Sequence, residues 1–165
     1  MKMHIVLVEP EIPQNTGNIA RTCAAIGAKL HLVYPLGFNI SEKQVKRAGL
    51  GYWDKLEIEE HINFKEFLEK YKPEDNNMFF VTTKGKHVYS EVDYSKMENV
   101  FILFGKETKG LPEETLKKYL SKTIRIPMKE TIRSLNLSNS VAIVAYEIFK
   151  QQKFGGLEKI SKYFD

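Results

Sequence analysis

The apolar residues of this chain fall in short unbroken runs, and longer polar stretches separate these runs. Unbroken runs of Val, Ile, Leu and Phe are typical of strands buried on both faces of a parallel sheet, whereas half-exposed strands alternate apolar and polar residues. The runs predict strands at residues 3–9, 30–34, 78–81 and 100–104, with weaker candidates at 56–58 and 124–128.

The stretches between the runs carry helix signals, because apolar residues recur there at helical spacing and Ser, Asn, Thr or Pro stand near their starts. The alternation of strands and helices predicts an α/β fold, with a mostly parallel sheet and helices on both faces. We expect helices from Asn15 or Thr16 to Gly27, Ser41 to Arg47, Asn63 to Tyr71, Glu113 to Leu120 with Pro112 in the first turn, and from near Ser138 to Phe149.

Length and composition narrow the class of protein. A chain of 165 residues is expected to form one domain, residues 1–165, in which residues 155–165 are a short amphipathic end or a flexible tail. The net charge of +4 and the pI of about 9.0 permit an anionic partner such as RNA without requiring one. A single cysteine, Cys23, allows no intrachain disulfide and favours a reducing compartment. We expect a cytoplasmic protein with no signal peptide and no membrane span.

Several familiar kinds of site are disfavoured. The loop from Gly105 to Gly110 resembles a phosphate loop, but Leu111 stands where that motif needs Lys. The glycines at 49 and 51 fail the dinucleotide fingerprint, because Asp54 occupies the third glycine position and a helix precedes them. The four histidines are scattered along the chain, so we expect no metal site. Cys23 is expected to serve only packing.

Polar segments follow four of the predicted strands, at residues 9–17, 81–85, 105–112 and 126–138. In an open parallel sheet, ligands bind beyond the carboxyl ends of the strands, so these segments are candidates for one site. The last segment leads into a helix N-terminus, which either holds a polar or anionic ligand or is only a capped surface helix. Arg21 is either functional or part of a solvated helix face.

A second candidate surface lies near residues 43–53. It carries charged and aromatic side chains, which could bind RNA by charge and stacking or could form a packed corner between a helix and a strand. These residues are Lys43, Lys46, Arg47, Tyr52 and Trp53.

Three segments carry a resemblance to a known family. The segments Glu9 to Arg21, Phe104 to Pro112, and Ile124 to Met128 with Arg133 to Asn139 resemble the three motifs of the SPOUT-superfamily RNA ribose methyltransferases. The match runs from about residue 3 to 150 and is nearest to the minimal type, which methylates the 2′-hydroxyl of the nucleotide at tRNA position 34. Lys106 departs from the usual Pro, and Ala20 and Ser140 vary within the motifs.

The resemblance implies S-adenosylmethionine as the methyl donor, a homodimer, a deep trefoil knot at the C-terminal end, the tRNA anticodon stem-loop as substrate, and no metal. It places the donor at Val81, Thr82, Gly105, Gly110, Ile126, Ser134 and Leu135. It places catalytic positions at Arg21, Glu107, Asn136 and Ser138. Arg133 and Tyr146 match further residues of the minimal type, and Lys43, Lys46, Arg47 and Arg133 are candidates for a basic RNA groove.

The chemistry would be a direct methyl transfer. Because the pKa of arginine lies above 12, Arg21 is expected chiefly to orient the ribose hydroxyl and a neighbouring phosphate. Three alternatives remain: a methyltransferase for another tRNA position or for ribosomal RNA, an RNA-binding module without catalysis, and a nucleotide-dependent enzyme of ordinary doubly wound fold, which the failed motifs oppose.

Overall fold

A computed structural model describes residues 1–164 of the chain except 42, 44–46 and 48–50. Within these residues, seven strands form one sheet in the order β3-β2-β1-β6-β4-β7-β5, and every neighbouring pair is parallel. The strands are β1 (Lys2–Val8), β2 (Lys29–Val33), β3 (Ile58–His61), β4 (Met78–Val81), β5 (His87–Val88), β6 (Asn99–Phe104) and β7 (Thr123–Arg125).

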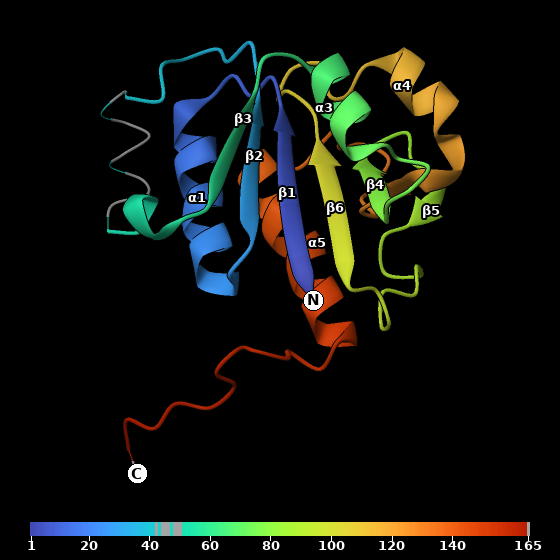
Figure 1. Cartoon of the computed structure of the whole chain (residues 1–165). Helices are drawn as coiled ribbons and strands as arrows, with labels where there is room; N and C mark the ends of the chain where they lie inside the picture. Colours follow the sequence, from blue (N-terminus) through green and yellow to red (C-terminus); the bar gives the residue numbers. More distant parts are fainter. Residues whose placement is uncertain (42, 44–46, 48–50, 165) are drawn as a thin grey trace.

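Helices cover both faces of the sheet (Figure 1). The described helices are α1 (Pro13–Ile26), α3 (Phe64–Tyr71), α4 (Glu113–Lys118) and α5 (Leu137–Gln151), with short 3-10 turns at η1 (Trp53–Lys55) and η2 (Leu120–Lys122). Helices α1 and α5 pack side by side on one face, whereas α3 and α4 lie on the other. The predicted α/β class is therefore confirmed.

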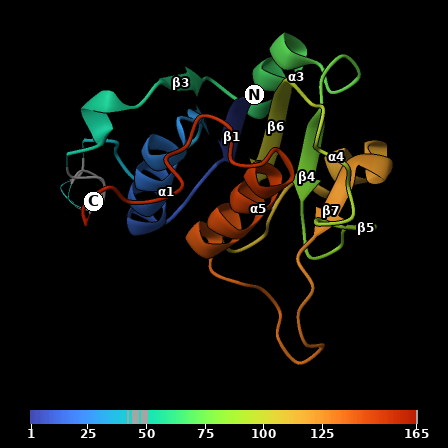
Figure 2. The same ribbon diagram turned by 90° about the horizontal axis from the view of Figure 1, so that it is seen from below.

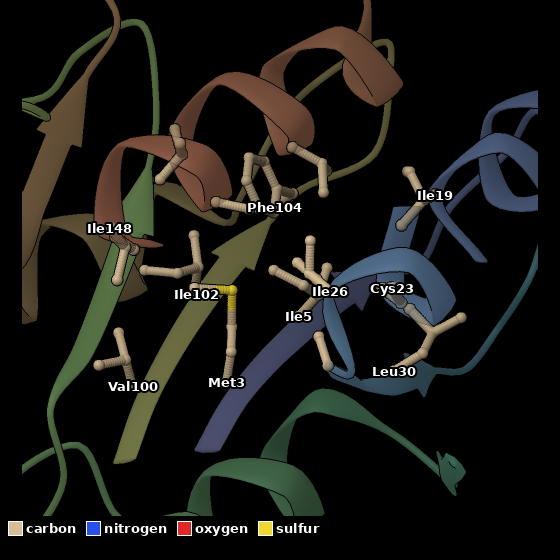
Figure 3. Packing of buried hydrophobic residues seen from close by; sticks show 14 of the residues in the cluster. Met3, Ile5, Ile19, Cys23, Ile26, Leu30, Val100, Ile102, Phe104 and Ile148 are labelled. Carbon is tan, nitrogen blue, oxygen red and sulfur yellow. The ribbon is translucent and has the colours of Figure 1, made fainter. Parts of the chain in front are cut away.

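The two faces have separate hydrophobic cores, because side chains alternate along each strand. Met3 and Ile5 of β1 and Ile102 of β6 point to the α1–α5 side, where they meet Cys23 and Ile148 (Figure 3). The intervening strand residues face α3 and α4. Both faces of the central strands are thus buried, which explains their unbroken apolar runs.

Most predicted elements lie within a few residues of the observed ones, and the differences have local causes. Helix α1 begins at Pro13 and not at Asn15 or Thr16, with Ile12 as a cap residue that makes no side-chain cap bond. Pro112 precedes α4 as its cap residue and is not part of its first turn. Strand β5 was not predicted, since it has only two residues. Asn63 caps α3 as expected, accepting a hydrogen bond from the Glu66 N–H.

Two further predictions concern the helix from Ser41 to Arg47 and the C-terminal tail. Most of the helix predicted from Ser41 to Arg47 lies outside the described residues. The tail beyond Gly155 leaves the body of the molecule (Figure 1), and its described part contains no helix, so the amphipathic-end alternative is not observed there. Among the described residues, none belongs to a helix long and apolar enough to cross a membrane.

The scattered histidines are brought together by the sheet. His4 of β1, His31 of β2 and His61 of β3 are buried on the α3 side, on adjacent strands. Desolvation lowers the pKa of His4 to about 4 and that of His31 to about 3, so both rings are neutral near pH 7. The sequence spacing gave no indication of this cluster, because it depends on how three strands are placed beside each other.

Candidate functional site

A hollow of about 500 Å³ lies beyond the carboxyl ends of β4, β6 and β7. This volume is within the usual range for small-molecule sites. All four predicted polar segments contribute to its wall, so the expectation that they converge is confirmed. The seven residues expected to hold a methyl donor all line it: Val81, Thr82, Gly105, Gly110, Ile126, Ser134 and Leu135.

The loop after β6 owes its shape to two glycines. Gly110 has φ +68°, in the left-handed region that favours glycine, and its N–H donates to the Lys106 carbonyl at 2.8 Å. A Cβ added at Gly105 would lie only 2.0 Å from the carbonyl carbon of Gly110. The two ends of the loop therefore touch through bare backbone, which folds residues 105–110 into a tight wall of the hollow.

Two glutamates join this loop to the segment before α1. The carboxylate of Glu107 accepts the N–H of Glu11 at 2.8 Å and that of Ile12 at 3.0 Å. In return, the carboxylate of Glu11 accepts the backbone N–H of Thr108 at 3.1 Å and its hydroxyl at 2.7 Å. These bonds from Thr108 lower the pKa of Glu11. We call this reciprocal pair of links the carboxylate clasp.

The clasp lies directly before the start of α1. The first N–H groups of a helix have no partner within the helix, and a carboxylate at that end is favoured by the helix dipole. Glu107 supplies a carboxylate close to that end from far along the chain, and it accepts the N–H groups of Glu11 and Ile12, which directly precede the first helical residue, Pro13.

A chain of amides connects a third segment to the clasp. Asn15 donates from Nδ2 to Glu107 at 3.4 Å, and Asn136 donates from Nδ2 to the Asn15 Oδ1 at 3.1 Å. Asn136 is also the cap residue of α5, and its Oδ1 accepts the Asn139 N–H at 3.2 Å and the Ser138 hydroxyl at 2.6 Å. The prediction that a polar side chain caps the helix beginning near Ser138 is confirmed, and the cap residue is Asn136.

The rim of the hollow is cationic. Lys84, Lys106, Lys109 and Arg133 all line it and come from three different loops. Lys84 is partly neutralised by an ion pair with Glu113 at 2.6 Å. The loop between β7 and α5, which carries Arg133, projects from the body of the molecule (Figure 2). A positively charged rim suits a phosphate-bearing ligand.

Other predicted residues lie away from the hollow. Arg21 is on the middle turns of α1, not its first turn, and its exposed guanidinium lies over the Tyr52 ring at 5.0 Å. Tyr146 is 45% exposed on α5. Ser138 does not line the hollow, and its hydroxyl donates a hydrogen bond to Asn136. Lys43 and Arg47 are exposed, and Lys46 lies outside the described residues.

The structure adds residues that the sequence did not single out. Asn15 and Glu11 belong to the bonds that unite the loops, and Phe104, Leu111 and Met128 give the hollow apolar wall. The acidic and amide residues of the segment from Glu9 to Gly17 were a visible signal. Their partners were not, because these partners lie about a hundred residues away.

The sheet is parallel, the hollow at the carboxyl ends of its strands is walled by a glycine-containing loop, and its rim is cationic. This arrangement suits a small polar ligand beside a phosphate-bearing one. The SpoU rRNA Methylase family matches residues 2–146. The chain belongs to this family.

The names of individual relatives and solved structures also refer to RNA methylation. The chain is 44% identical over 158 residues to a Yersinia pestis protein named tRNA (cytidine(34)-2'-O)-methyltransferase, covering 93% of this chain and 96% of the relative. A solved structure described as "Structural insights into the 2-OH methylation of C/U34 on tRNA" is 43% identical, with a TM-score of 0.85 and coverage of 93% and 97%. An AdoMet-bound rRNA methyltransferase from Sinorhizobium meliloti is 27% identical, with a TM-score of 0.81, covering 90% of this chain and 56% of that one.

Proposed function

We propose that this chain transfers a methyl group from S-adenosylmethionine to the ribose 2′-hydroxyl of nucleotide 34, a cytidine or a modified uridine, in tRNA. The observation that carries the proposal is the hollow whose wall contains all seven expected donor residues. The relatives that share nearly the whole length of the chain are named for this reaction.

The hollow fits the donor by its chemistry. Phe104, Leu111 and Met128 offer apolar contacts for a flat base, and the backbone around Gly105 and Ile126 offers the hydrogen-bonding groups that recognise its edge. The side chains of exposed Ser134 and half-buried Thr82 add hydroxyl groups. When bound there, S-adenosylmethionine would supply a methyl group on a positively charged sulfur.

The residues of the chain then act by placing and orienting the acceptor. Holding two reactants in attack geometry can lower a barrier by about 7–11 kcal/mol. Glu107 and Asn136 are already bonded to neighbouring loops, so we assign them to the shape of the donor site. Ser138 supports Asn136. Arg133, on the cationic rim, is placed to meet the substrate phosphates.

Arg21 is assigned to the acceptor. Its guanidinium stays charged, so it orients the ribose hydroxyl and a neighbouring phosphate by donating hydrogen bonds, and the hydroxyl proton leaves late to water. Because Arg21 is exposed and does not line the hollow of its own chain, we propose that it serves the hollow of a second copy in a homodimer. Exposed Tyr146 would belong to the contact between copies.

The remaining parts of the proposal concern the whole chain. Residues 1–165 would form one cytoplasmic domain that binds no metal for methyl transfer, and the anticodon stem-loop would lie across a groove with Lys43, Lys46, Arg47 and Arg133.

A deep trefoil knot is supported by β7, which lies between the consecutive strands β4 and β5. The connection from β4 to β5 must pass over it, and a Cβ at Gly85 would lie 2.5 Å from the Ile124 carbonyl carbon.

Ribosomal RNA, or another tRNA position, is the second candidate substrate, because the family carries an rRNA description and a 27% identical neighbour is an rRNA methyltransferase. A binding module without catalysis is the third. The test is incubation of the protein with labelled S-adenosylmethionine and either total tRNA or ribosomal RNA, followed by mapping of the modified ribose. Label at position 34 of tRNA supports the proposal. Label only in ribosomal RNA, or none with a folded protein, overturns it.

A further inference from the structure

The buried histidine cluster lies on β1, β2 and β3, in the half of the strand order away from the strands that carry the methyl-donor hollow. His31 of β2 and His61 of β3 are almost fully buried beneath α3, and Glu59 of β3 points to the same face, with its side chain 18% exposed. Strand β3 is one of the two edge strands of the described sheet, whereas the hollow is built on β4, β6 and β7. Methyl transfer as proposed above makes no use of these residues.

Three side-chain atoms of the cluster lie close together. His31 Nδ1 lies 3.0 Å from His61 Nε2, which lies 3.6 Å from Glu59 Oε1, and all three are within 4.8 Å of one another. Around a tetrahedral zinc ion with bonds of about 2.0–2.2 Å, ligand atoms are about 3.3 Å apart. The separations of 3.0 and 3.6 Å bracket this value and the third pair lies within 4.8 Å, so a single ion could bind all three atoms after side-chain movements.

Two of the other polar atoms of these residues, His31 Nε2 and Glu59 Oε2, already have partners. His4 Nδ1 forms a hydrogen bond with His31 Nε2 at 2.8 Å. Lys29 Nζ lies 2.6 Å from Glu59 Oε2, and the Tyr71 hydroxyl donates to the same oxygen at 2.8 Å. Partners of this kind fix the orientation of metal-binding side chains and are a regular part of metal sites. They leave His31 Nδ1 and Glu59 Oε1 directed into the cluster.

One group competes for the site. Lys70 Nζ lies 2.5 Å from Glu59 Oε1 and would be repelled by a bound cation. Its side chain is 56% exposed, so it can turn into solvent at little cost. The charge of Glu59 would then be shared between the ion and Lys29.

We propose that His31, Glu59 and His61 form a binding site for one Zn(II) ion, through His31 Nδ1, Glu59 Oε1 and His61 Nε2. Two imidazoles and a carboxylate are a ligand set that zinc takes in proteins, with a fourth position left for water. The ion would link β2 to the edge strand β3 beneath α3 and stabilise that side of the sheet. This inference does not depend on the methyl-transfer activity.

The test is isothermal titration of the full-length, tag-free protein with Zn(II) after treatment with a chelator. We expect one ion per chain with micromolar or tighter affinity, and a Co(II) form with the visible absorption of a tetrahedral site. Glu59→Gln and His61→Gln should bind Zn(II) at least about tenfold more weakly. His87→Gln is the matched control, since His87 is exposed on β5, and it should bind as the wild type does.

A further variant separates a metal site from a purely hydrogen-bonded cluster. Lys70→Met removes the competing ammonium from Glu59 Oε1 and should strengthen Zn(II) binding several-fold. Zn(II) should also raise the melting temperature of the wild type and of His87→Gln, but not that of Glu59→Gln. If His61→Gln does not fold, Glu59→Gln and Lys70→Met decide the question. Less than half an equivalent bound by the wild type, or equal affinity in Glu59→Gln, would overturn the proposal.

Discussion

The substitution Glu107→Gln distinguishes a carboxylate that holds the donor site together from one that takes part in the chemistry. The Glu107 carboxylate accepts two backbone N–H groups, at 2.8 and 3.0 Å, just ahead of helix α1. Glutamine has the same size but only one acceptor oxygen. Its amide nitrogen would face a backbone donor, so one hydrogen bond and the negative charge near the helix N-terminus are both lost.

The expected cost follows from these two losses. A hydrogen bond to a charged group contributes ~1.5–3 kcal/mol, and a charge at a helix N-terminus contributes ~0.3–1 kcal/mol. Glu107 is partly exposed, so the lower ends apply. We expect the free energy of unfolding to fall by roughly 2 kcal/mol, which at an m value of about 2 kcal/mol/M moves the urea midpoint down by about 1 M.

Steady-state kinetics complete the measurement. If Glu107 positions the loops, its replacement should raise KM for S-adenosylmethionine about tenfold, which corresponds to ~1.4 kcal/mol of binding, and should leave the shape of the pH–rate profile unchanged. The control is Glu69→Gln on α3, where the side chain is 67% exposed and distant from the hollow. Its stability should change by less than about 0.5 kcal/mol. Unchanged stability of Glu107→Gln together with the loss of one limb of the pH–rate profile would refute the positioning role.

Three further predictions concern other parts of the chain. Gly105→Ala should lower stability in urea by ~1–3 kcal/mol, because the added Cβ meets backbone at 2.0 Å, whereas Gly155→Ala should be nearly neutral. Because burial raises the pKa of the Cys23 thiol to about 12, a thiol reagent at pH 8 should label it only after unfolding in urea, and fast labelling of the native protein would contradict its burial. If Arg21 serves the hollow of the second copy, co-expression of Arg21→Ala and Asn136→Ala chains should restore about a quarter of wild-type activity. Random pairing makes half of the dimers mixed, and each mixed dimer has one intact site of two. No recovery would mean that Arg21 serves the hollow of its own chain.

The sheet was predictable because its information is local. The run from Val100 to Phe104 is apolar throughout, since its residues face helices on both sides, and no partner strand is needed to recognise it. The convergence of the polar segments followed from one general rule, namely that the carboxyl ends of parallel strands share an edge. The two-residue strand β5 was missed because His87 and Val88 alone make no pattern.

The start of α1 could not be predicted because its stabilising partner is distant. Sequence rules search for a cap next to the helix, and Asn15 was the natural candidate. The carboxylate that accepts the N–H groups of Glu11 and Ile12, just ahead of the helix, comes from Glu107, after β6. The histidine cluster was missed for the same reason. His4, His31 and His61 meet only through the pairing of three strands, and the register of that pairing is not written in their spacing.

These observations bear on why the motif residues are polar. In an ordinary core, loops are fixed by packing, but the walls of this hollow must leave room for a ligand and cannot pack against each other. The loops around Glu11, Glu107 and Asn136 are joined by hydrogen bonds from side chains to backbone and to other side chains instead. Motif residues that resemble catalytic acids and amides therefore have their polar atoms occupied within the protein. Methyl transfer needs little more than two reactants held in place. In a site of this kind, recognition of the RNA substrate can therefore depend on the exposed cations Arg21 and Arg133.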